Sequence, residues 1–114
     1  MSWADEAIET LRQGAYTRIQ ARGDSMTGKV NDGDMVTLEY CEPKKLAVGD
    51  VVLVKVKSAV LLHQITAINA KEGRFQIGNT RGEVKGWVGG NAIYGRATRI
   101  KPPPKPQVNI NTLK

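Results

Sequence analysis

The spacing of apolar residues along this 114-residue chain changes after Gly14. Before it, the apolar residues of segment 2–13 fall on one face of a helix: Trp3, Ala7, Ile8 and Leu11. Ser2 followed by Asp5 is close to a capping box, and glycine is the residue type that commonly ends a helix. The pattern predicts one amphipathic helix over 2–13 that docks its apolar face on the rest of the chain. A contact with a partner protein is the alternative.

From Tyr16 onward, the pattern is typical of β-strands. Short runs rich in β-branched and aromatic residues alternate with Gly, Asn and Asp turns. The strands are expected at residues 16–21, 35–40, 51–57, 60–68, 74–77, 86–88 and 93–100. Short strands at this spacing predict an all-β sheet or partly closed barrel with one short N-terminal helix. Two similar sequences, Gly33-Asp34-x-Val36 and Gly49-Asp50-x-Val52, indicate two similar turns that lead into strands.

Composition divides the chain into a domain over residues 1–100 and a Pro-rich basic tail over 101–114, which is expected to be extended or disordered. The net charge is +6, but residues 96–114 carry five basic side chains and no acidic one. The rest of the chain has 12 basic and 11 acidic residues. Binding of the folded body to phosphate backbones is therefore not favoured, and a nucleic-acid partner remains an alternative only through the tail.

Several classes of protein are not expected. The longest apolar runs, 51–54 and 59–62, fall far short of the roughly 20 residues that a membrane-spanning helix needs, and the N-terminus lacks the layout of a signal peptide. One cysteine, Cys41, excludes an internal disulfide framework, so a cytoplasmic location is the simplest expectation. A single histidine argues against a multi-histidine metal site, and no cofactor is expected.

Ser25 stands in a setting that suits a nucleophile. It follows Gly23-Asp24 directly after an expected strand, and Met26 follows it. A glycine before a nucleophile lets the backbone turn sharply, which leaves the N–H of the nucleophile available as an oxyanion donor. The local pattern makes Ser25 a candidate catalytic residue, with an ordinary turn serine as the alternative.

The order of motifs around Ser25 resembles the LexA/signal-peptidase superfamily of serine peptidases. The matching segments, in order over about residues 16–100, are Gly23-Asp24-Ser25-Met26, Gly33-Asp34-Met35-Val36, Gly49-Asp50-Val51-Val52, the strand Val60–Ile65, Gly78-Asn79 and Ile93-Tyr94-Gly95-Arg96. The resemblance implies a LexA-like peptidase fold, which is a coiled antiparallel sheet or partly open barrel. It also implies that Ser25 attacks a peptide bond and that the strand 60–65 carries the general base.

His63 stands at the base position, where bacterial members of the superfamily carry lysine. Signal peptidases of the endoplasmic reticulum and of archaea carry histidine there. An unperturbed histidine titrates near pH 6.5 and is already mostly neutral at pH 7. On a strand His63 shares a face with Leu61 and Ile65, so its surroundings should be apolar. The resemblance implies a Ser25–His63 dyad, and the alternative is a buried strand histidine with a satisfied hydrogen bond.

The remaining candidate site residues are less specific. Histidine-type relatives carry an aspartate in the region that reads Gly78-Asn79-Thr80-Arg81-Gly82-Glu83 here, so the aspartate is missing. Asn79 is the candidate for orienting the histidine ring through its side-chain carbonyl, and Glu83 is the only nearby carboxylate. Asp24 is a second candidate orienting or oxyanion residue, and Met26 is a candidate for the substrate groove.

These residues predict a stand-alone soluble serine peptidase that cleaves an extended protein substrate, bound as an added strand at the sheet edge near Ser25. A self-cleaving repressor is not expected, because the chain has no Ala-Gly dipeptide and only 24 residues before Ser25. Three alternatives stay open. They are a catalytically silent peptide-binding module of the same fold, a Cys41–His63 pair, and a nucleic-acid-associated β-domain.

Overall fold

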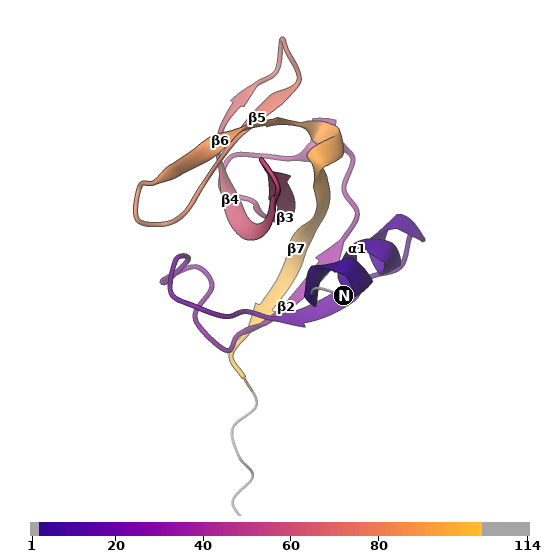
Figure 1. Ribbon diagram of the computed structural model, residues 1–114, viewed down its shortest axis with the longest axis vertical. Helices are drawn as coiled ribbons and strands as arrows, with labels where there is room; N and C mark the ends of the chain where they lie inside the picture. The colour runs from indigo at the N-terminus through magenta and orange to yellow at the C-terminus, as the bar shows by residue number, and fades with distance from the viewer. Residues whose placement is uncertain (1–2, 104–114) are drawn as a thin grey trace, which may run out of the picture.

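The computed structural model describes residues 3–103 and has a seven-stranded sheet that curls into a half-barrel, with one short helix at its side (Figure 1). The expected all-β fold with one N-terminal helix is confirmed. The elements in chain order are α1 (Trp3–Arg12), β1 (Thr17–Gln20), β2 (Met35–Glu39), η1 (Pro43–Lys45), β3 (Val51–Val56), β4 (Ala59–Asn69), β5 (Arg74–Gly78), β6 (Val84–Gly89), η2 (Gly90–Ala92) and β7 (Ile93–Lys101).

The strand order is β1-β2-β7-β3-β4-β5-β6, and every neighbouring pair is antiparallel. Strand β4 is long enough to pair with two different strands on its two edges. Its first half, 59–64, pairs with β3, and its second half, 64–69, pairs with β5. Residues 59–63 therefore have β3 on one side and, within residues 3–103, no strand on the other.

Strand β3 needs an apolar residue at nearly every position, because both of its faces are buried. Its side chains alternate between two cores, so almost all of them are buried. Val51 and Leu53 pack with α1, β1 and β2 in the first core. Val52, Val54 and Val56 pack with residues of β4, β5 and β6 in the second. The strand thus forms the shared wall of both halves of the molecule.

The repeated Gly-Asp sequences form two turns of the same design. In each turn the glycine has a positive φ, +87° at Gly33 and +98° at Gly49, which favours glycine. The following aspartate carboxylate accepts a hydrogen bond from the backbone N–H three residues earlier, at 2.8 Å for Asp34 and 2.9 Å for Asp50. The two sequences are therefore turns that start β2 and β3.

Helix α1 docks through Ala4, Ala7, Ile8 and Leu11. Trp3, expected on that face, is 58% exposed instead, because Ala4 takes the buried position at the start of the helix. Two expectations lie outside the described residues, the cap at Ser2 and the state of the tail over 104–114. No helix within residues 3–103 is both long and apolar enough to cross a membrane.

Candidate active site

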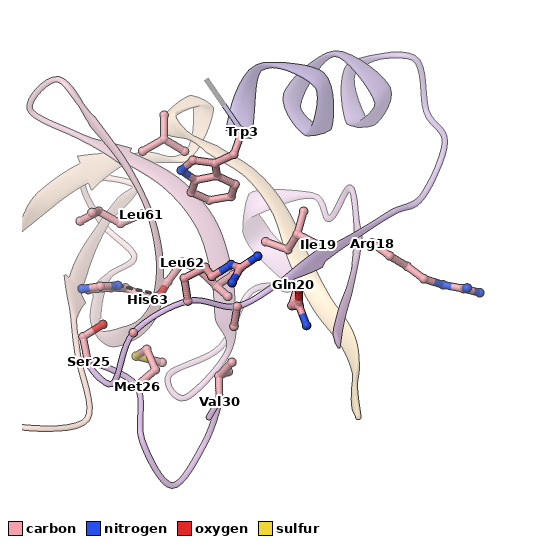
Figure 2. Close-up of a pocket in the computed structure, with 14 residues that line it drawn as sticks. Trp3, Arg18, Ile19, Gln20, Ser25, Met26, Val30, Leu61, Leu62 and His63 are labelled. Carbon is pink, nitrogen blue, oxygen red and sulfur yellow. Dashed lines mark hydrogen bonds between the residues drawn. The ribbon is translucent and has the colours of Figure 1, made fainter. Parts of the chain in front are cut away.

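A pocket of about 600 Å³ opens between β1 with its following loop and the first half of β4 (Figure 2). Ser25 and His63, which are far apart in the sequence, both line it. Its other walls are mainly apolar and include Ile19, Val30 and Leu62, with Trp3 at the helix end. The pocket therefore brings the two predicted catalytic residues into one cavity.

The pocket lies between the edges of β1 and β4, where some backbone groups are not bonded to a neighbouring strand. Ala21 exchanges hydrogen bonds with Asp34 and Gly33 on the β2 side, and Ile65 bonds to Asp50 and Gly49 on the β3 side. Hydrogen-bonding direction alternates along an antiparallel strand. The backbone groups of Arg18 and Gln20, and those of Val60 and Leu62, therefore point away from their partner strands, and of these the Leu62 carbonyl accepts a hydrogen bond from the His63 ring. These residues all line the pocket.

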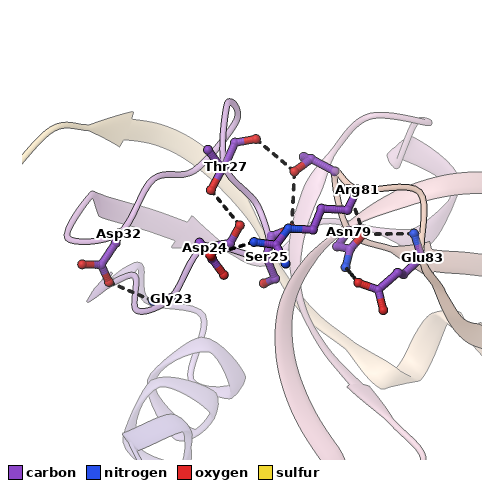
Figure 3. A network of polar contacts seen from close by, with 9 residues as sticks. Gly23, Asp24, Ser25, Thr27, Asp32, Asn79, Arg81 and Glu83 are labelled. Atoms are coloured by element: carbon purple, nitrogen blue, oxygen red, sulfur yellow. Dashed lines mark hydrogen bonds and ion pairs between the residues drawn. The ribbon is translucent and has the colours of Figure 1, made fainter.

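Ser25 sits in a turn that is held from several sides (Figure 3). Before it, the N–H of Gly23 donates to the Asp32 carboxylate at 2.8 Å. From the opposite loop, the N–H of Thr80 donates to the Ser25 carbonyl at 3.2 Å, and the Thr80 hydroxyl lies 2.9 Å from the Thr27 carbonyl and 3.3 Å from the Ser25 carbonyl. The N–H of Ser25 itself donates to no acceptor within residues 3–103. The carbonyl is thus fixed while the N–H stays free.

Lys29 ties the same loop to the strand that carries His63. Its ammonium group donates hydrogen bonds to the carbonyl of Gly49 and to the side-chain oxygen of Gln64, the latter at 3.0 Å. Gln64 follows His63 directly and also donates to the backbone carbonyl of Asn79 at 3.1 Å. These hydrogen bonds hold the loops that contain Lys29, Gly49 and Asn79 around Gln64 on β4.

His63 is only 5% exposed, and its ring orientation is set by the backbone. Its Nδ1 lies 2.6 Å from the carbonyl oxygen of Leu62. A carbonyl oxygen can only accept, so Nδ1 carries the hydrogen and the neutral ring presents a lone pair at Nε2. Within residues 3–103, Nε2 is the one buried side-chain nitrogen or oxygen without a hydrogen-bond partner. Figure 2 shows the Ser25 side chain directed toward this ring, although no hydrogen bond joins the two residues.

Burial lowers the pKa of His63 below its ordinary value of 6.5, because the charged ring would lose its hydration. The hydrogen bond to Leu62 opposes this shift. The positive charge of Lys85 lowers the pKa further, and the negative charge of Glu83 raises it. Burial dominates, so the imidazole is neutral at pH 7.

The side chain of Asn79 does not hydrogen-bond to His63. Its Oδ1 accepts from the N–H groups of Arg81 and Glu83, at 2.9 and 3.0 Å, and its Nδ2 donates to the Glu83 carboxylate at 2.9 Å (Figure 3). Both ends of this amide, which is 3% exposed, are used to shape the 79–83 loop. The ring-orienting contact expected from Asn79 is provided by the Leu62 carbonyl instead.

Of the other candidate residues, only Met26 lines the pocket. The Asp24 carboxylate forms an exposed ion pair with Arg81 at 2.7 Å, which joins the Ser25 loop to the 79–83 loop. Met26 is 4% exposed and belongs to the first core, while also lining the pocket. Cys41 lies against the second core and does not line the pocket, so no Cys41–His63 pair forms there.

The contributors that were not anticipated from the sequence include the Thr80 N–H on Ser25, the Leu62 carbonyl on His63, and the charge of Lys85 near His63. The Leu62 contact is made by a backbone group and carries no residue-type signal. Thr80 directly follows the Gly78-Asn79 motif, which was the only available signal.

Within residues 3–103, no group of three or more His, Cys, Asp or Glu side chains is placed to hold a metal ion. No model of a known protein family matches the chain. A search of curated proteins finds no significant match either. Function must therefore be inferred from the chemistry of the pocket.

Proposed function

We propose that this protein is a serine peptidase of the LexA/signal-peptidase type, with Ser25 as nucleophile and His63 as general base. The observation that carries the proposal is the state of the His63 ring. Its Nε2 is buried and has no hydrogen-bond partner within residues 3–103, its lone pair is fixed by the Leu62 hydrogen bond, and the residue lines the same pocket as Ser25. An unsatisfied buried polar atom is costly, and such atoms often mark functional sites.

The proposed substrate is an extended peptide that lies between the free edges of β1 and β4. It would add a strand there, pairing with backbone groups such as those of Gln20 and Val60. The apolar walls would receive alternate side chains of the peptide, which places its scissile carbonyl beside Ser25. Because main-chain pairing is independent of sequence, specificity would come from the pocket walls.

In the proposed reaction, Ser25 Oγ attacks the scissile carbonyl carbon as its proton moves to His63 Nε2. The oxyanion that forms accepts a hydrogen bond from the free N–H of Ser25. His63 then returns the proton to the leaving amine, and the C–N bond breaks to give an acyl-enzyme. Water activated by the same ring hydrolyses the ester. Catalytic hydrogen bonds are often long without substrate, so the missing Ser25–His63 bond is compatible with this sequence of steps.

A catalytically silent peptide-binding module is the second candidate. The absence of a hydrogen bond between Ser25 and His63 favours it. Such a module would use the same two edges but would leave the peptide intact.

The test is covalent labelling by an aryl phosphonate probe that reacts with activated serines. We expect the probe to modify Ser25, located by mass spectrometry of the digested protein. Ser58 is exposed in the β3–β4 turn and serves as the control within the same molecule, since an unactivated serine should stay unmodified. Equal labelling of Ser25 and Ser58, or of neither, would contradict the peptidase and support the binding module.

The rate of this labelling is expected to depend on pH through His63. Protonated imidazole cannot accept the serine proton, so the rate should fall as pH falls through the His63 pKa. Burial holds that pKa below 6.5, so the midpoint should lie below 6.5 and most of the rate should be present at pH 7. Measurement of labelling rates between about pH 4 and 8 checks this. A midpoint at or above 6.5 would show that His63 is not the buried base.

A further inference from the structure

The outer face of β1, β2 and β7 is left uncovered by residues 3–103. On β1 and β2 the buried residues, such as Val36 and Leu38, alternate with more exposed ones such as Arg18 and Thr37. The covered face packs on α1 and the first core. The opposite face holds a shallow hollow of about 720 Å³. This second hollow is separate from Ser25 and His63, neither of which lines it.

Positive charge dominates this hollow. Arg18, Arg99 and Lys101 line it, with Glu39 as the only carboxylate. The ion pairs found within residues 3–103 are Arg81–Asp24, Lys85–Glu83 and Arg96–Asp50. None of the cations of the hollow takes part in them. Their charges are therefore available to an anionic partner.

The strand register places these cations along a path. Arg18 and Arg99 both pair with Thr37, so they flank it on opposite sides, about 10 Å apart at a strand spacing of roughly 4.8 Å. Lys101 lies two residues further along β7, or about 7 Å at roughly 3.4 Å per residue. The sequence separates Arg18 from the basic C-terminal region, but the sheet brings them together.

An aromatic ring stands at one end of this path. Tyr16 is 58% exposed, and the guanidinium of Arg18 lies over its ring at 5.6 Å. Both planar groups can stack on a nucleobase. Unpaired cations beside an exposed aromatic ring on an open sheet face are the features that proteins use to hold single-stranded nucleic acid. An acidic peptide would need the cations but would have no use for the ring.

We propose that the β1–β2–β7 face binds single-stranded nucleic acid, with backbone phosphates at Arg18, Arg99 and Lys101 and a base stacked on Tyr16. The test of this binding is independent of the peptidase proposal, because Arg99 and Lys101 do not line the Ser25 pocket. Arg18 lines both hollows and is therefore left unchanged in the test.

The experiment measures fluorescence anisotropy of a labelled oligothymidylate with the full chain over a range of salt concentrations. Neutralising three phosphates predicts a slope of about −2 in log K against log salt, which weakens binding ~20-fold between 50 and 200 mM salt. The variant Arg99→Gln/Lys101→Gln should bind more weakly and have a slope reduced to about −0.7. The control Lys44→Gln/Lys45→Gln removes the same charge from exposed positions outside the hollow and should match the unaltered chain.

A second pair of variants separates nucleic acid from other anions. Tyr16→Leu should lower the affinity at least about fivefold by removing base stacking, while Tyr16→Phe should keep it. A labelled polyglutamate of equal length should bind more weakly than the oligonucleotide. Undetectable oligonucleotide binding at low salt, equal loss in the two double variants, no change in Arg99→Gln/Lys101→Gln, or tighter binding of polyglutamate would each overturn the proposal.

Discussion

Replacement of Ser25 by alanine is expected to lower kcat/KM for peptide hydrolysis by about 10⁴-fold or more, because the residual rate would come only from substrate binding and the oxyanion donor. The backbone N–H of residue 25 is kept in this variant, as is the hydrogen bond from the Thr80 N–H to its carbonyl. The loss would therefore report the hydroxyl alone. The measurement is hydrolysis of a peptide that the unaltered protein cleaves, identified by mass spectrometry of a digested peptide library.

Two controls keep this result specific. Ser58→Ala removes an exposed hydroxyl from the β3–β4 turn and should leave kcat/KM unchanged. The melting temperature of Ser25→Ala should stay close to that of the unaltered protein, because Ser25 is only partly buried and its hydroxyl makes no hydrogen bond within residues 3–103. Equal cleavage by the unaltered chain and Ser25→Ala would end the peptidase proposal.

Ile65→Ala is expected to lower the free energy of unfolding by about 2–5 kcal/mol. Ile65 is fully buried in the second core, and its side chain has the same orientation on β4 as that of His63. Removal of its larger side chain leaves a cavity that this packed core can close only in part. Urea denaturation followed by circular dichroism measures the change.

A graded control comes from the same position. Ile65→Val removes one methylene group and should cost about 0.5–1.5 kcal/mol. Val84→Ala, at a residue that is 56% exposed, should change stability by no more than about 0.5 kcal/mol. If Ile65→Ala were no more destabilising than Val84→Ala, the second core could not be packed as described.

The sequence pattern predicted a strand well where nearly all of its side chains lie in the same kind of environment, such as a buried core. The run over residues 51–57 matches β3, because a strand buried on both faces needs apolar residues at nearly every position. The glycines and aspartates of the repeated turns predicted where β2 and β3 begin. The Trp3 prediction was wrong because helical spacing gives the apolar face but not which large side chain the neighbouring elements can accommodate.

For the candidate site, the sequence predicted which residues take part but not which groups they contact. Sequence placed Ser25 after a glycine turn and His63 on an apolar strand, and both line one pocket in the structure. The partners of these residues could not be predicted from residue types. His63 Nδ1 donates its hydrogen bond to a backbone carbonyl, and the Asn79 amide is used by its own loop. Likewise, counting charges along the chain did not reveal that strand pairing brings Arg18 beside Arg99 and Lys101.

The Leu62 carbonyl has a consequence for how the site can vary. A side-chain partner such as an aspartate is lost by one substitution, whereas every residue type at position 62 presents the same carbonyl group. The tautomer of His63 is therefore set by the backbone of β4 and not by the identity of another side chain. Substitutions around the pocket can then alter its walls freely while the ring keeps its lone pair at Nε2. In the proposed mechanism, the Leu62 carbonyl therefore does the orienting work that a third catalytic side chain would otherwise do.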